Sequence, residues 1–88
     1  MDKDIVLIEW VDSHSGKGWE MLDKLREKAE PLYCRSVGWV ISENEECKVV
    51  VPHISGEENG DIMLQGCGDI TIPMKAIVKV ITLRPYQA

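Results

Sequence analysis

The stretch DSHSGKGW, residues 12–19, holds the residue types best suited to contacting an anion. It lies between an apolar run that is typical of a strand and a run with helical periodicity. A lysine between two glycines, where free backbone N–H groups open a helix, favours a bound phosphate. The residues predicted to contact such a ligand are His14, Ser15, Gly16, Lys17, Gly18 and Trp19.

This loop is not a Walker nucleotide-binding loop. That motif needs a hydroxyl residue directly after its lysine and a glycine six positions before it. Here Lys17 is followed by Gly18, and no glycine stands at the required distance. A purely structural interpretation also remains, in which Asp12, Ser13 or Ser15 caps the helix and the glycines only turn the chain.

Trp19 and a second pair of glycines extend the candidate site. An aromatic face beside Lys17 suits a nucleotide, because the base can stack on the ring while the cation holds the phosphate. Alternatively, Trp19 anchors the helix by packing. Gly66 and Gly68 could let the backbone approach a ligand, or they could bend a strand.

The cysteines and histidines do not form a recognisable metal or catalytic motif. Cys34, Cys47 and Cys67 are widely spaced, so we expect reduced, buried thiols without a disulfide or a metal. Cys67 with His53 could serve as nucleophile and base, but no third group to orient the histidine can be named. The sequence therefore predicts a protein that is not an enzyme and binds no metal or cofactor.

Several short elements must position these residues. Ile5 to Val11 is rich enough in β-branched residues to predict a strand. A helix is predicted from Trp19 to Glu30, because apolar residues recur there at spacings of three and four and Pro31 ends the pattern. Its narrow apolar stripe predicts that the helix lies on a sheet.

After the helix the pattern becomes strand-like. The predicted strands cover residues 32–42, 47–55, 62–72 and 76–83, with a single turn at 72–76 before the last. Gly66 and Gly68 should bend the fourth strand. Trp39 is expected in the core, whereas Trp10 is ambiguous.

This order predicts a mainly β fold of the α+β type, a small SH3-like or Sm-like five-stranded barrel with one helix inserted after the first strand. The 88 residues are expected to form one domain, residues 1–88. Apolar residues occupy both faces of the strands at 5–11, 47–52 and 76–83. Outer faces must therefore be covered by the helix or by another copy, which predicts a homo-oligomer.

Composition restricts the partners. The net charge of -5 disfavours duplex nucleic acid, whose binding depends on Lys and Arg. No apolar run is long enough to span a membrane, and the N-terminal residues do not resemble a signal peptide, so we expect a cytoplasmic protein. The acidic residues cluster in two turns, which are either solvated turns or a surface that mimics DNA phosphates: Glu43, Glu45, Glu46 and Glu57, Glu58, Asp61.

Motifs in a fixed order resemble small proteins encoded by bacteriophages and prophages. They are HSGKGW before the helix, SVGW at residues 36–39, VVPHIS at 50–55 and QGCGDITIP at 65–73. The resemblance implies a phage accessory protein acting in the cytoplasm of an infected bacterium. It brings no catalytic residues.

Three function classes follow. The first is a non-catalytic protein that sequesters a small anionic, nucleotide-type ligand, such as a cyclic or ADP-ribose-derived signal of bacterial immunity, in pockets between copies. The second is an inhibitor or adaptor that binds a host enzyme through its acidic surface. The third is an Sm-like nucleic-acid-binding factor, which the acidic balance disfavours.

Overall fold

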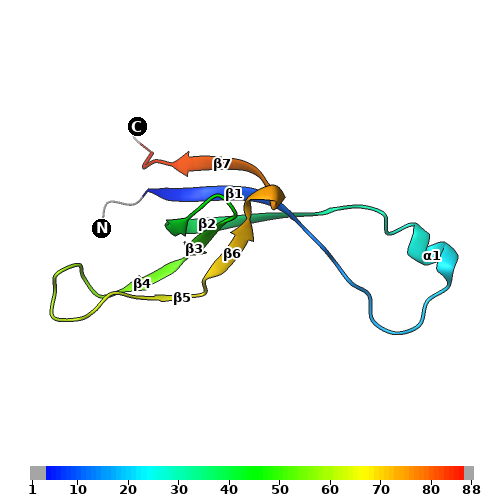
Figure 1. Ribbon diagram of the computed structural model, residues 1–88, viewed down its shortest axis with the longest axis horizontal. Coiled ribbons are helices and arrows are strands. Elements are labelled where there is room, and N and C mark those ends of the chain that lie inside the picture. Colours follow the sequence, from blue (N-terminus) through cyan, green and yellow to red (C-terminus); the bar gives the residue numbers. More distant parts are fainter. Residues whose placement is uncertain (1–3, 87–88) are drawn as a thin grey trace.

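The computed structural model describes residues 4–86, and most of them lie in strands (Figure 1). The elements are β1 (Ile5–Asp12), α1 (Leu22–Arg26), β2 (Leu32–Glu43), β3 (Cys47–Val51), β4 (His53–Ser55), β5 (Gln65–Cys67), β6 (Ile70–Pro73), the 3-10 turn η1 (Met74–Ala76) and β7 (Ile77–Leu83). The fold is therefore mainly β with one short helix, as the sequence predicts. Within residues 4–86 no helix has the length and apolarity needed to cross a bilayer.

Five strands form an antiparallel sheet in the order β6-β3-β2-β1-β7. The last strand returns to pair with the first, so that Leu83 lies opposite Ile5. Beyond the sheet, β4 and β5 pair with each other and extend the β3 and β6 ladder into a projecting hairpin (Figure 1).

Closure into a barrel was expected, but the described sheet is open. Its edge strands are β6 and β7, which η1 connects without a ladder between them. Two of the predicted strands are also each divided in two. Pro52, which has no N–H to donate, separates β3 from β4, and Gly68 lies in the left-handed region (φ 78°) between β5 and β6. The predicted bend at the glycine pair is therefore confirmed.

The hydrophobic core is small, and its main cluster lies on one face of the sheet. The buried members of this cluster are Val6, Ile8, Val50 and Ile72, while Val51 is buried on the opposite face, beside Gly66. Alternate residues of a strand point to opposite faces, so Val6 and Ile8 define the inner face of β1. Trp10 packs against this cluster and donates a hydrogen bond from its indole nitrogen to Ser36 Oγ at 3.0 Å.

The opposite face of the sheet is also apolar. Ile5 lies across from both Trp39 and Leu83, and Leu7 lies across from both Val37 and Ile81. We call these residues the outer face: Ile5, Leu7, Val37, Trp39, Ile81 and Leu83. Trp39 is half-buried there, so its predicted place in the core was wrong.

The predicted helix does not cover the outer face. Residues 13–31, here called the arm, project away from the sheet between β1 and β2, and α1 lies near the far end (Figure 1). The helix has 5 residues, none of them buried, instead of extending from Trp19 to Glu30. The prediction was wrong because a periodic apolar stripe forms a long helix only where it has a surface to pack on, and residues 4–86 offer the arm no such surface.

The chain is far from compact. Its radius of gyration is 17.6 Å and its dimensions are 57 × 33 × 29 Å. A compact domain of this length has a radius of gyration of about 12 Å. The excess comes from the arm on one side of the sheet and the β4–β5 hairpin on the other (Figure 1).

Candidate functional site

The base of the arm continues the sheet and its two limbs are tied together. Asp12 and Leu32 are the last paired residues of β1 and β2. Further out, His14 donates a hydrogen bond from Nε2 to the carbonyl oxygen of Glu30 at 2.7 Å. A carbonyl can only accept, so this bond places a proton on Nε2 and holds the DSHSGKGW loop beside the returning limb.

The returning limb brings a second lysine to the loop. A Cβ built on Gly16 would lie 3.0 Å from the Nζ atom of Lys28, so this ammonium group lies against the Gly16 backbone. The sequence-based set did not include Lys28. Only the antiparallel return of the arm places it next to Gly16, and no motif in the sequence marks that contact.

The arm separates paired from unpaired cations. Lys24 lies 4.0 Å from Glu20, and Arg26 lies 2.5 Å from Asp23. Among residues 4–86, no ion pair is formed by Lys17 or Lys28. The arm therefore presents two ammonium groups, on Lys17 and Lys28, that no carboxylate of the described residues neutralises.

The loop is open on the side of Trp19. The Trp19 side chain is fully exposed, so its alternative interpretation as a packing anchor within this chain was wrong. Gly18 has a positive φ of 78°, and nothing lies within 4 Å of where its Cβ would be. An exposed aromatic face, an open stretch of backbone and two ammonium groups thus lie on the same arm.

The helix terminus does not contribute to this site. The N-cap residue is Met21, which follows the loop, and no side chain caps the helix. The Asp12 carboxylate instead accepts a hydrogen bond from the backbone N–H of Ser13 at 2.8 Å. Both the predicted helix-opening amides and the predicted Asp12, Ser13 or Ser15 cap were therefore wrong, because α1 begins three residues after Trp19.

Gly66 and Gly68 lie on the other projection of the chain, in and just after β5, so one chain does not bring them to the arm (Figure 1). Both have a role in packing the chain. A Cβ on Gly66 would lie 2.9 Å from Val51 Cγ2, and one on Gly68 would lie 3.2 Å from Pro52 Cγ. These glycines permit the close approach of β5 to the end of β3.

The cysteines are all free. Cys34 and Cys47 are half-buried and Cys67 is exposed, so the expectation of burial was wrong for Cys67, whose strand leaves the main sheet. Cys67 lies directly opposite His53 in the β4–β5 ladder. In the described part of the chain no hydrogen bond joins these two side chains, and no group of potential ligands is arranged to hold a metal.

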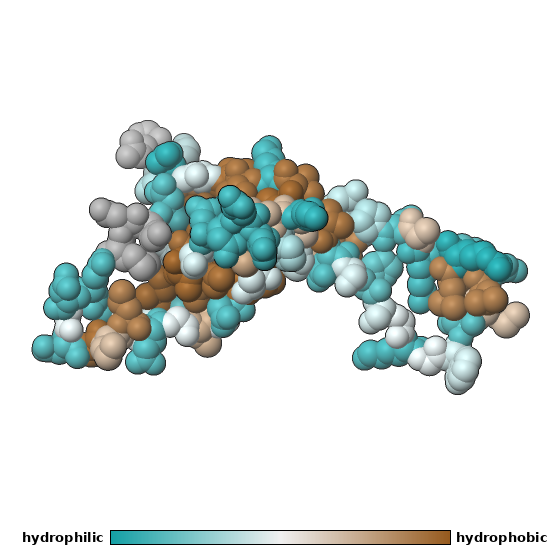
Figure 2. Space-filling view, viewed as in Figure 1, coloured by the Kyte–Doolittle hydropathy of each residue, from teal (hydrophilic) through white to brown (hydrophobic). Residues whose placement is uncertain are grey.

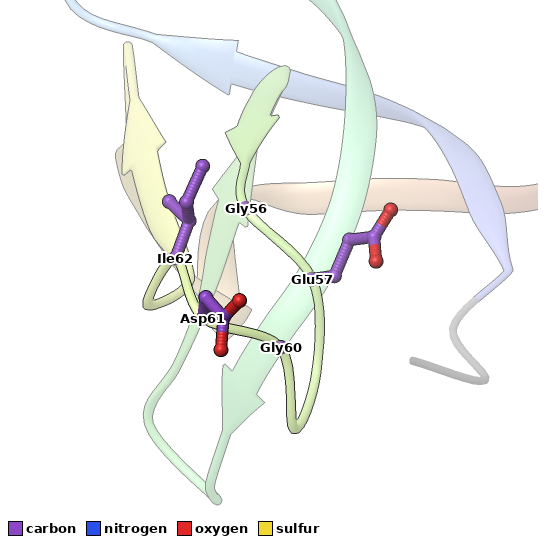
Figure 3. A pocket seen from close by; sticks show the side chains of 5 residues that line it. All are labelled: Gly56, Glu57, Gly60, Asp61 and Ile62. Carbon is purple, nitrogen blue, oxygen red and sulfur yellow. The ribbon is translucent and has the colours of Figure 1, made fainter.

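The end of the β4–β5 hairpin holds a hollow of about 430 Å³ with an acidic lining (Figure 3). Gly56, Glu57, Gly60, Asp61 and Ile62 line it. Glu57 and Asp61 come from opposite limbs of this loop, and the Glu57 side chain points away from it. The Asp61 carboxylate at this hollow repels a phosphate, so the hollow is poorly suited to an anion.

No protein-family model, curated protein or solved structure matches the chain. The site must therefore be interpreted from its own chemistry.

Proposed function

We propose that the protein is a non-catalytic binding protein that sequesters a small anionic ligand of the nucleotide type. The observation that carries the proposal is that one arm holds two lysines without an ion-pair partner among residues 4–86, Lys17 and Lys28, together with the fully exposed ring of Trp19. In keeping with the resemblance of the motifs, we place this activity in a phage accessory protein in the bacterial cytoplasm. There it would withdraw a nucleotide signal of host defence.

Each part of the loop has a distinct contribution to such binding. Lys17 and Lys28 provide charge-assisted hydrogen bonds to phosphate oxygens. Trp19 provides a face on which a base stacks. Gly18 leaves room for the ligand to approach the backbone, and His14 fixes the loop by its bond to Glu30.

The complete pocket requires more than one chain. The arm projects from the molecule and offers no enclosed cavity, whereas small-molecule sites bury most of their ligand. Gly66 and Gly68 lie on the other projection, so they join this site only from a second copy (Figure 1). A homo-oligomer would supply the missing wall.

We further propose that the sheet belongs to the SH3-like or Sm-like architectures. The support is its meandering order with the last strand beside the first, together with the single 3-10 turn before β7. In this interpretation the arm occupies the first strand connection, where a loop can be elaborated without disturbing the sheet.

The test begins with ligand capture. Purified protein is incubated with a bacterial nucleotide extract, filtered and denatured, and the released compounds are identified by mass spectrometry. We expect a phosphorylated nucleotide at a fixed ratio to the chain. The absence of any retained small molecule would contradict the proposal.

Lysine variants then locate the site by calorimetry with the captured compound. Lys17→Ala and Lys28→Ala should each weaken binding about 10- to 150-fold, the equivalent of about 1.5–3 kcal/mol for a charge-assisted hydrogen bond. Lys24→Ala is the matched control, because it removes the same charge from the same arm but its ammonium is already close to Glu20. Equal losses in all three variants would indicate a general charge effect rather than a site.

A second candidate function rests on the acidic hollow of the hairpin. Its exposed carboxylates, Glu57 and Asp61, are suited to a basic surface on a host enzyme (Figure 3). Capture of a host protein that Glu57→Lys together with Asp61→Lys abolishes, while nucleotide retention is unchanged, would favour this inhibitor function.

A further inference from the structure

We infer that the arm of one copy packs on the outer face of the sheet of a second copy. In this interface the apolar side chains of Met21, Leu22 and Leu25 on one copy pack against the outer face of the other copy. The interface does not depend on any ligand, because it rests on apolar surfaces that residues 4–86 leave exposed or only half-buried.

The exposed area is the first observation. A compact monomer of 9.9 kDa exposes about 5,200 Å² by the scaling of folded proteins, whereas this chain exposes 7635 Å². The excess is about 2,400 Å² per chain, and a standard stable interface buries only about 800 Å² per partner. The chain thus has enough unburied surface for an obligate interface.

The arm provides one half of that interface. Met21, Leu22 and Leu25 are all exposed, and Figure 2 shows apolar side chains gathered over α1, apart from those over the sheet. A helix of 5 residues is too short to be stable in water without tertiary packing. The ordered arm therefore needs a surface on which to bury this apolar stripe.

The outer face provides the other half. Two in-register rows, Leu83 with Ile5 and Trp39, and Ile81 with Leu7 and Val37, make it continuously apolar across three strands. The next row, Lys79, Glu9 and Arg35, is charged and marks its boundary, with Arg35 3.6 Å from Glu9. No helix of the described residues covers this face.

The arm cannot reach its own outer face. It leaves the sheet where Asp12 and Leu32 are still paired, and the bond from His14 to Glu30 continues that direction. The arm therefore extends beyond the strands instead of folding back over them (Figure 1). Each copy carries one arm and one outer face, so reciprocal contacts between copies can form a closed, symmetric assembly.

Light scattering on three variants tests this interface. Wild-type protein should be oligomeric at tens of micromolar. Leu22→Glu on the arm and Val37→Glu on the outer face should each raise the apparent dissociation constant by at least about tenfold, because a charge is placed in the apolar interface. Met63→Glu is the matched control, since Met63 is apolar and exposed but lies near the end of the other projection.

Mixing distinguishes an arm-to-sheet contact from a sheet-to-sheet contact. The intact arm of the Val37→Glu chain can bind the intact outer face of the Leu22→Glu chain, so equal amounts of the two should form a 1:1 complex that neither forms alone. Far-UV circular dichroism checks the fold of each chain. Leu22 contacts no core, so its variant is expected to fold even if Val37→Glu does not.

Three results would overturn the inference. A monomeric wild type at tens of micromolar would remove the second copy altogether. Unchanged association of Leu22→Glu would mean that sheets pack on sheets or that the arm serves another partner. Two folded variants that fail to form a complex on mixing would show that the arm and the outer face do not meet.

Discussion

At the scale of single residues, stability depends on a very small set of buried side chains. Ile8 and Ile72 are completely buried, and among residues 4–86 the only other buried hydrophobic side chains are Val6, Val50 and Val51. Because so few neighbours can rearrange, a cavity at either position should remain largely unfilled.

We therefore predict that Ile72→Ala lowers the free energy of unfolding by about 2–5 kcal/mol. Val78→Ala, at an exposed position of β7, should change it by less than about 0.5 kcal/mol. Urea denaturation at one fixed protein concentration measures both, so that association does not differ between the samples. Similar midpoints for the two variants would show that the inner face is not the core.

At the scale of elements, the arm and the sheet are separable. The arm buries none of the α1 residues, and its base is a continuous ladder ending at Asp12 and Leu32. Removing the arm therefore removes exposed apolar surface without opening the core.

Replacing residues 14–30 with Asn-Gly, a sequence suited to a tight hairpin, should leave the sheet folded. We expect the strand signal in circular dichroism to persist while both oligomerisation and nucleotide retention are lost. A variant that unfolds would contradict the separation. A folded variant that keeps its oligomeric state would contradict the arm-to-sheet interface alone.

The sequence predicts some elements of the fold well and others poorly. Strands β1, β2 and β7 are predicted within one residue at each end, because β-branched runs bounded by polar turns have few other solutions. The apolar stripe through Leu22 and Leu25 predicts that these side chains are buried, but it does not indicate whether they pack on their own chain or on another copy. The sequence does not indicate Lys28 for a similar reason, because its place beside Gly16 depends on the path of the returning limb.

The sequence predicts part of the candidate site, because residue types can be interpreted from sequence whereas contacts between distant residues cannot. The residue types from His14 to Trp19 identify a loop suited to anions, and the structure keeps them together on the arm. Gly66 and Gly68 were grouped with them because glycine marks both ligand contacts and close backbone approaches. Within one chain these glycines serve close backbone approach, because a Cβ on Gly66 would contact Val51 and one on Gly68 would contact Pro52.

At the scale of the whole molecule, stability should depend on concentration. An assembly that buries the arm and the outer face stabilises the folded chain by mass action. We predict that the melting temperature of the wild type rises over a 100-fold increase in protein concentration, whereas that of Leu22→Glu stays constant. Differential scanning fluorimetry measures both series, and parallel slopes would argue against the interface.

The pairing of β1 with β7 also has a consequence for biosynthesis. Ile5 pairs with Leu83, and Leu7 pairs with Ile81. Strand β1 therefore lacks one of its two neighbours until nearly the whole chain has left the ribosome. During that interval the nascent chain exposes an unpaired strand edge together with the apolar arm. Translation that stops after η1 would release an incomplete sheet, and we expect such products to aggregate or be degraded instead of joining full-length copies.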